Sequence, residues 1–309
     1  MEAQDDFEAV YAALAPELEA VERERRQLRR SAIRKGGFIA AGLSAAGAAL
    51  SAVAGEGWIV PVAAAVAGSV WLLVVSARSA EVSSHYKRRI VPGLVSALCE
   101  RAEYSPEEGI PMDRFCESLL FAVPDRYAAE DRIAGRVGRT DFVCSEVHAE
   151  QKRVTTDSKG RTKTYWVDIF RGFFFTADFN KDFRGCTVLH RNSLIKLGQG
   201  GKRVKLEDPA FEKRFDVYSS DEVEARYILS PAMMGYLVEL DRRYDGQVVV
   251  SFRRSSVTVA VSDRTDHFEA GVWKRIDDRA RIRREYDTIR SLLGIVGLLN
   301  LNTRIWTKK

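Results

Sequence analysis

The sequence predicts an α+β domain with a mainly antiparallel sheet, preceded by a two-helix transmembrane hairpin. Residues 36–77 contain two apolar runs and a single charged residue, Glu56, although charged residues make up 29% of the 309-residue chain. Beyond residue 130, several segments are rich in β-branched and aromatic residues with period-two alternation, as in strands. These segments are grouped with helical ones rather than strictly alternating with them, which favours α+β over a parallel α/β fold.

Residues 1–35 are expected to form a helical cytosolic arm. Apolar residues recur there at spacings of three and four, as on one face of a helix: Phe7, Tyr11, Leu14, Leu18 and Val21. Pro16 is expected to end a first helix near Leu14 and to open a second one. Because the stripe covers only about two heptads, we expect it to dock onto the chain itself rather than form a coiled coil. The basic residues of 23–35 are placed at anionic headgroups.

The transmembrane hairpin is assigned to residues 36–77, with spans at 36–54 and 58–77. Each run has about the 20 residues that a helix needs to cross a bilayer. Only Gly55-Glu56-Gly57 separates them, so the spans must be antiparallel neighbours. A cleaved signal peptide is excluded because the first run lies deep in the chain and a second follows directly. A buried hairpin in a soluble core is disfavoured because neither run contains a charge.

The flanks of the hairpin predict its orientation. Arg and Lys are dense before residue 36 and after residue 77 but absent from the connecting turn. Both termini are therefore expected in the cytoplasm, with Glu56 on the far side. Small residues at four-residue spacing predict close packing within the hairpin, with self-association into a homo-oligomer as the alternative: Ala40, Ser44, Ala48, Ala64 and Gly68.

Residues 78–309 are assigned to the cytosolic domain. A helix is expected over 81–104 with a possible kink at Pro92, and a shorter one after Pro111. Strands are predicted at 131–138, 140–153, 161–178, 185–190, 214–218, 247–252 and 256–261, with helices from Asp221, over 231–244 and over 277–299. The polar, basic segment 154–162 is expected to be a hairpin loop.

Composition excludes several classes of function. The net charge of +5 is modest for this length, so no nucleic-acid partner is expected. The four cysteines show no CxxC spacing and are predicted to be reduced. Gly198-Gln-Gly-Gly-Lys lacks P-loop spacing and is assigned to a loop. The four histidines are scattered, and neither a cofactor nor a metal site is expected.

Three groups of residues are candidate binding sites. Asp221 and Glu224 form a capping-box-like helix start, and Glu222 with Arg226 suits an i,i+4 pair. The alternative for this segment is a polar site in which Glu224 and Arg226 point into a groove. Asp178 falls in a segment most simply assigned to a turn between strands. A basic group near the C-terminus is either a solvated helix face or a membrane-contacting surface: Arg279, Arg281, Arg283 and Arg284.

Several long motifs carry a family resemblance. They are FRGFFFTADFNKDFRG at 170–185, LEDPAFEKRFDVYSSDEVEARYILSP at 206–231, SFRR at 251–254 and LNTRIW at 301–306. Together they resemble the bacterial membrane-protein family catalogued as domain of unknown function 3137, sometimes labelled "galanin". The resemblance covers about residues 80–309 and implies a multi-pass protein of the bacterial inner membrane with a cytosolic domain. It supplies no activity or site residues, and nothing in the chain supports the neuropeptide role that the label suggests.

The leading functional hypothesis is a membrane-anchored, non-enzymatic module that binds a protein or a lipid surface. No nucleophile, base and orienting group occur at recognisable spacing. Its expected partners are membrane lipids and another membrane or cytosolic protein; fragment 80–309 is expected to bind anionic vesicles in a salt-sensitive way through the terminal arginines. The alternative is an enzyme acting on a membrane-proximal substrate through Glu224, Arg226 and Asp178. A transporter is disfavoured because no ionisable residue lies mid-span.

Overall fold

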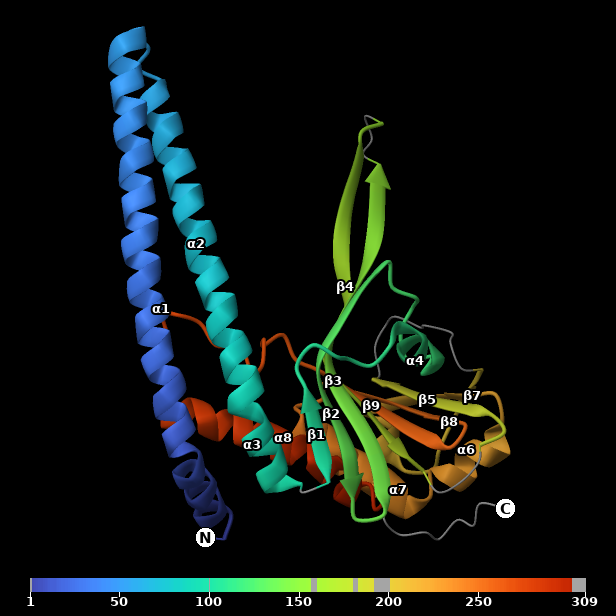
Figure 1. The fold of residues 1–309 in the computed structure, drawn as a ribbon. Helices are drawn as coiled ribbons and strands as arrows, with labels where there is room; N and C mark the ends of the chain where they lie inside the picture. The colour runs from blue at the N-terminus through green and yellow to red at the C-terminus, as the bar shows by residue number, and fades with distance from the viewer. Residues whose placement is uncertain (1, 100, 157–159, 180–182, 192–200, 302–309) are drawn as a thin grey trace. The chain divides into compact units, whose positions relative to one another are not determined.

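The structure is a computed structural model that describes all residues except 1, 100, 157–159, 180–182, 192–200 and 302–309 (Figure 1). Its described residues fall into two compact units. Unit 1 comprises the chain up to Ala97 together with Phe268–Asp287, and unit 2 comprises Leu98–His267 together with the chain from Thr288 onward.

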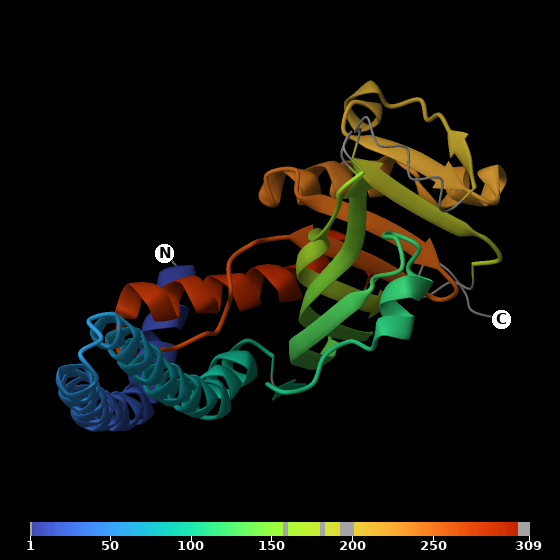
Figure 2. The ribbon, with the colours of Figure 1, turned by 90° about the horizontal axis from the view of Figure 1, so that it is seen from above.

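Unit 1 is built on a pair of long antiparallel helices that lie side by side (Figures 1 and 2). Helix α1 spans Glu2–Ala54, α2 spans Ile59–Arg89, and the short α3 follows at Val91–Leu98. The turn between α1 and α2 is tight, and the Trp58 indole donates to the Glu56 carboxylate at 3.0 Å. Pro61 falls in the first turn of α2, where a missing N–H costs little. The two-helix hairpin follows the sequence prediction.

Glycine and alanine form the seam of the hairpin. A Cβ atom on Gly47 would overlap the Ala63 side chain, and one on Gly36 would lie 2.7 Å from the Trp71 ring. A Cβ on Gly68 would meet nothing within 4 Å. The two helices therefore approach closely, as predicted, but through Gly36, Gly47 and Ala63 rather than through the predicted small residues. The predicted residues Ser44, Ala48, Ala64 and Gly68 are exposed, and Ala40 is half-buried.

Pro16 does not end a helix, contrary to the prediction, because α1 continues through it. A proline in a helix interior costs about 3 kcal/mol. Phe7, on the N-terminal side of Pro16 in the same helix, and Leu18, on its C-terminal side, are each only 1% exposed. Burying a side chain of that size stabilises by about 1.5–3 kcal/mol, so packing on both sides of Pro16 offsets its cost.

Both long helices are long and apolar enough to cross a membrane. Their apolar side chains are largely uncovered in the described part of the chain: Phe38 is 74% exposed, Val53 88% and Leu73 68%. A soluble protein would hide such side chains in its core. This exposure argues against the alternative in which the two helices form a buried hairpin in the core of a soluble protein.

Unit 2 is organised around one sheet with the strand order β1-β2-β3-β4-β9-β8-β5-β7-β6. Every pairing between neighbouring strands of this described sheet is antiparallel. The strands are β1 Ala102–Ser105, β2 Arg126–Val137, β3 Thr140–Thr156, β4 Thr162–Asp178, β5 Cys186–Arg191, β6 Lys202–Val204, β7 Phe215–Ser219, β8 Val248–Arg253 and β9 Ser256–Ser262. The predicted α+β class with an antiparallel sheet is confirmed.

Helices cover both faces of this sheet (Figures 1 and 2). Helix α4, Met112–Glu117, lies on one face, where Phe115 joins a buried cluster that includes Val147, Phe170 and Phe174. Helix α7, Pro231–Arg243, lies on the other face. The remaining helices are α5 Pro209–Glu212, α6 Glu222–Ile228 and α8 Arg279–Leu298, whose residues from Thr288 onward belong to unit 2.

One predicted helix is wrong in part. The expected helix over 81–104 ends as α2 at Arg89, restarts as α3 and gives way to β1. Pro92 stands at the start of α3, as its lack of an N–H favours. The sequence of β1, Ala-Glu-Tyr-Ser, shows no strong alternation, and its strand conformation comes from pairing with β2. Of the expected loop at 198–202, residues 198–200 lie outside the described residues.

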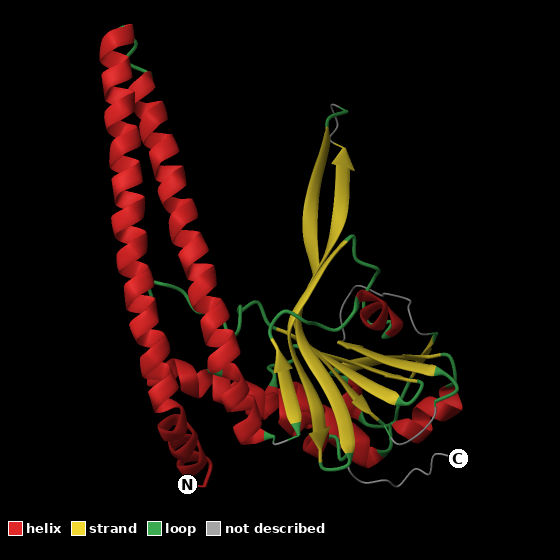
Figure 3. Ribbon diagram, viewed as in Figure 1, coloured by secondary structure: helices red, strands yellow, loops and turns green. Residues whose placement is uncertain are grey.

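The outer halves of β3 and β4 form a two-stranded ribbon that projects from the sheet (Figure 3). Pairing of β4 with β9 begins only at Gly172, whereas pairing of β3 with β4 extends to Thr156 and Thr162. We call residues 151–156 and 160–167 the outer ribbon. Most of its residues are exposed, which places them in contact with solvent rather than with the core.

Candidate functional site

Glu224 has a structural role in unit 2. Its carboxylate accepts hydrogen bonds from the backbone amides of Arg184 at 3.1 Å and Gly185 at 2.8 Å. Asp221 caps α6 by accepting from the Glu224 amide at 3.0 Å. The predicted helix start is therefore present, but the Glu224 side chain fixes the loop before β5 instead of returning to Asp221.

Arg226 lies on the surface of α6 and pairs with two carboxylates. Its guanidinium is 3.0 Å from Glu222, the i,i+4 partner that the sequence suggested, and 2.6 Å from Glu207. Asp178 ends β4, opposite Ser256 of β9. The contacts of Glu224 and Arg226 are to different segments of the chain. A site that these two residues share with Asp178 stays a prediction.

The four terminal arginines lie in unit 1, where three of them form ion pairs within the protein. Arg279 pairs with Glu8, and Arg283 pairs with Asp287 at 3.0 Å while lying over the Phe7 ring. Arg281 pairs with Glu285 at 3.0 Å and its side chain is only 11% exposed. Arg284 also has an interaction partner. Lipid contact through this group stays a prediction, and any such contact must compete with these ion pairs.

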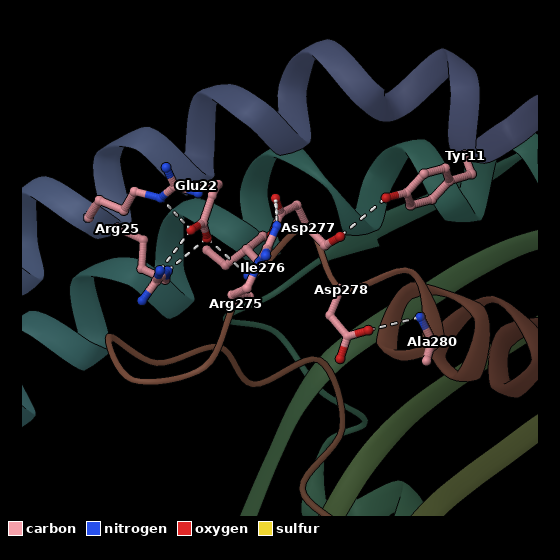
Figure 4. A network of polar contacts seen from close by, with 9 residues as sticks. Tyr11, Glu22, Arg25, Arg275, Ile276, Asp277, Asp278 and Ala280 are labelled. Carbon is pink, nitrogen blue, oxygen red and sulfur yellow. Dashed lines mark hydrogen bonds and ion pairs between the residues drawn. The ribbon is translucent and has the colours of Figure 1, made fainter.

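A buried ion pair joins the arm of α1 to the segment 268–278 within unit 1 (Figure 4). The Glu22 and Arg25 side chains are each 4% exposed, and their charged atoms lie 2.7 Å apart. Arg25 also donates to the carbonyl of Val272 at 2.5 Å, and Glu22 accepts from the Ile276 amide at 3.1 Å. Burial opposes the ionisation of Glu22, but these hydrogen bonds outweigh it and lower its pKa to about 2.

Glu269 binds α2 in the same unit. Its carboxylate lies 2.6 Å from the Lys87 ammonium and accepts from the Ser83 hydroxyl at 2.6 Å. Further along the segment, Glu285 accepts a hydrogen bond from the buried Tyr86 hydroxyl. The segment from Phe268 to Asp287 is thus fastened to both α1 and α2, so it moves with the helix pair rather than independently of it.

The outer ribbon carries basic and aromatic side chains. Its described residues include four basic ones, Lys152, Arg153, Arg161 and Lys163, and no acidic ones. The ribbon also exposes large apolar groups: Val154 is 57% exposed, Tyr165 42%, Trp166 36% and Val167 37%. The Arg126 guanidinium lies 3.5 Å from the centre of the Trp166 ring. Such a combination of cationic and amphipathic aromatic groups suits a negatively charged surface.

Comparisons with known proteins identify one domain of the chain. Residues 168–301 match the model of a family described as a protein of unknown function, DUF3137. The chain carries a DUF3137 domain. This match confirms the family resemblance of the motifs in β4, in the segment 206–231 and in β8. The DUF3137 domain begins inside β4, so the hairpin and strands β1–β3 precede it.

The other comparisons find little. No curated protein matches the chain. A solved structure, the crystal structure of the mycobacterial trehalose monomycolate transport factor A, TtfA, is 12% identical, with a TM-score of 0.38. That similarity covers 69% of this chain and 95% of the other.

Sequence reasoning treated the tip of the outer ribbon, residues 154–162, as a loop, and named that loop for partner recognition only if the terminal arginines do not bind lipid. Strand was predicted for 140–153 and 161–178, but 154–162 was assigned to a connecting loop, of which 154–156 prove to be strand. Of the predicted loop, residues 157–159 lie outside the described residues, just ahead of the DUF3137 match.

Proposed function

We propose that this chain is a membrane-anchored, non-enzymatic module whose outer ribbon binds the anionic surface of the membrane that anchors it. The observation that supports this function is the exposed ribbon with basic and aromatic side chains and no acidic residue among those described. Lys and Arg near an anionic membrane surface each contribute about 1 kcal/mol to binding. Exposed Trp and Tyr favour the headgroup region, where one end of the side chain is apolar and the other hydrated.

The hairpin of α1 and α2 supplies the anchor in this proposal. Arg30, Arg34 and Lys35 stand directly before the first span, and α1 and α2 expose apolar side chains along the spans. The orientation with both termini in the cytoplasm and Glu56 on the far side is part of the proposal, as is a bacterial inner-membrane location. Tethering raises the local concentration of lipid at the ribbon, so individually weak contacts suffice.

The enzyme alternative gains no support from the geometry. Glu224 is committed to two backbone amides and Arg226 to two surface carboxylates. Neither residue lines the cavity beside β4. A binding module is therefore the function that these side chains favour.

Proteolysis of the reconstituted full-length chain tests the ribbon. Chymotrypsin cleavage after Tyr165 and Trp166, followed by mass spectrometry, should be slower in nanodiscs of phosphatidylglycerol than in nanodiscs of phosphatidylcholine. High salt should remove the protection, because the Debye length falls to about 3 Å at 1 M. We expect at least about fivefold protection of the parent, whose four basic ribbon residues each contribute about 1 kcal/mol.

Matched variants sharpen this experiment. The triple variant Lys152→Gln, Arg153→Gln, Lys163→Gln should lose the protection. The control triple Arg101→Gln, Lys205→Gln, Lys213→Gln removes three exposed charges elsewhere on unit 2 and should keep it. Equal cleavage in both lipids at low salt would reject lipid binding and make a protein partner the better explanation of the ribbon.

A further inference from the structure

A histidine and two carboxylates converge where the outer ribbon meets the sheet. The metal-binding atoms of His148, Glu150 and Asp168 all lie within 4.8 Å of one another. His148 and Glu150 are two residues apart on β3, so they project from the same face of the strand. Asp168 pairs directly with Glu150 across the β3–β4 ladder, which brings it to that face as well.

A β-bulge creates this convergence. The register of β3 with β4 shifts between Ala149, which pairs with Phe170, and Glu150, which pairs with Asp168. Ile169 is the additional residue on β4. Without the bulge, the β4 residues on this face would change by one position, so Asp168 would not be opposite Glu150.

The two carboxylates are poorly compensated by the protein. Like charges placed directly opposite on neighbouring strands repel each other. Asp168 has His148 at 2.8 Å. Glu150 has, among the described residues, only the Arg126 guanidinium at 3.9 Å, on a side chain that is 57% exposed. Exposed ion pairs of that kind contribute at most about 1 kcal/mol. A bound cation would neutralise both carboxylates.

A cavity of about 430 Å³ opens beside this cluster and shares Asp168 with it. Arg171 and Arg264 line the cavity, together with Gln247 and Ser262 as neutral hydrogen-bonding groups. Arg171 pairs across the ladder with His148, so it projects from the same face. Among the residues that the structure describes, neither Arg171 nor Arg264 forms a salt bridge. Asp263, which also lines the cavity, already has the His267 imidazole at 2.9 Å.

We propose that His148, Glu150 and Asp168 bind a first-row divalent cation that, with Arg171 and Arg264, holds a phosphate-type anion in this cavity. One imidazole and two carboxylates are a suitable ligand set for such a cation, with positions left for water or an exogenous ligand. The cation offsets Glu150 and Asp168, which leaves the two guanidinium groups to attract the anion. Guanidinium groups recognise phosphate oxygens by paired hydrogen bonds. This site goes beyond the proposed ribbon contact and does not depend on it.

The sequence did not suggest this site. His148 and Asp168 lie 20 residues apart and meet only because β3 and β4 pair. Motif spacing detects ligands that share one helix or loop, whereas here the ladder register brings them together.

Mn²⁺ binding to the full-length chain in phosphatidylcholine nanodiscs tests the cation. The loss of the free Mn²⁺ electron paramagnetic resonance signal reports binding. We expect one saturable site, weakened at least about tenfold in His148→Ala and in the near-isosteric Asp168→Asn. The control His85→Ala removes a different histidine that also lies 2.9 Å from a carboxylate and should bind Mn²⁺ normally. Melting temperatures confirm that each variant is folded. Absent binding, or binding unchanged in both folded site variants, overturns the proposal.

Two separate measurements test binding of the anion. Both measurements are made with Mn²⁺ present. Calorimetry with glycerol 3-phosphate tests for binding of a soluble phosphate ester. Phosphatidic acid in the nanodisc tests for binding of a lipid headgroup, which is detected as a change in the Mn²⁺ signal. We expect at least one of these two phosphate compounds to bind. Arg171→Gln and Arg264→Gln should each weaken its affinity about tenfold or more. Anion binding that needs neither Mn²⁺ nor these arginines overturns the anion half of the proposal. The ribbon variants that test lipid-surface contact leave these ligands intact, so the two proposals fail separately.

Discussion

Glu146 is the buried carboxylate of β3 that lacks a cationic partner among the described residues. It is 6% exposed, and its carboxylate accepts from the backbone amide of His267 at 3.2 Å. Burial raises its pKa to about 8, and the nearby acids Asp266, Asp131 and Glu130 add to the effect. A carboxylate of the unfolded chain titrates near 4.3. The folded state therefore keeps a proton that the unfolded state has lost between these two values, and stability falls as pH rises through that window.

Glu146→Gln should remove this pH dependence. At pH 5 the melting temperature of the variant should match that of the parent, because Glu146 is protonated there. At pH 8.5 the melting temperature of the variant should be about 3–8 °C higher than that of the parent. The reason is that the variant avoids burying a charged carboxylate, which costs about 1–3 kcal/mol. Scanning calorimetry of the full-length chain measures both. The exposed control Glu103→Gln should show no such difference, and a variant less stable than the parent at pH 8.5 would contradict the account of Glu146.

The Glu22–Arg25 pair has the opposite pH dependence. The lowered pKa of Glu22 means that its contribution is present above the unfolded value near 4.3 and is lost as pH falls toward about 2. Glu22→Gln should lower the melting temperature at pH 7, because it leaves Arg25 buried without a counter-charge at a cost of about 3–5 kcal/mol. The double variant Glu22→Gln, Arg25→Met should recover part of the loss. Glu19→Gln, which breaks an exposed pair at 3.8 Å, is the control and should change little.

At the scale of elements, sequence patterns predicted the apolar helices and most strands but not their interruptions. The second span was visible as a continuous apolar run at 58–77, and the helix at 279–298 as a periodic apolar face. Pro16 suggested a break because its local cost is visible in the sequence, whereas the compensating burial of Phe7 and Leu18 depends on residues far along the chain. β1 and the cluster around Asp168 were missed for the same reason, since each depends on a strand partner. Glu224 was correctly placed near a capped helix start, but the loop that it binds could not be known.

A substitution in the seam between α1 and α2 tests the packing of the hairpin. Gly47→Val should lower the melting temperature of the full-length chain in nanodiscs, because its Cβ overlaps Ala63 on the facing helix. Gly42→Val is a matched control in the same helix, since a Cβ there meets nothing within 4 Å. Overpacking of this kind costs about 1–3 kcal/mol. Equal melting temperatures for the two variants would show that the helices do not pack along this seam.

At the scale of the whole molecule, the proposed topology places only the turn around Glu56 outside the cytoplasm. In a variant without native cysteines, Glu56→Cys should react with a membrane-impermeant maleimide added to intact cells. Val223→Cys, on a side chain that is 79% exposed in α6, should react only after permeabilisation. The reverse pattern would place the DUF3137 domain on the far side of the membrane. Self-association of the hairpin stays a prediction that crosslinking in the same cells can address.

The depth of Trp166 is the most direct measure of the proposed lipid contact. A full-length variant that keeps Trp166 and carries Phe at the other four tryptophans can be reconstituted with brominated phosphatidylglycerol, a quencher of nearby indoles. The proposal predicts that Trp166 fluorescence is quenched at low salt, that about 1 M salt removes the quenching, and that brominated phosphatidylcholine quenches much less. Fluorescence that is the same in both lipids and at both salt concentrations would contradict the proposal that the outer ribbon binds the anionic membrane surface.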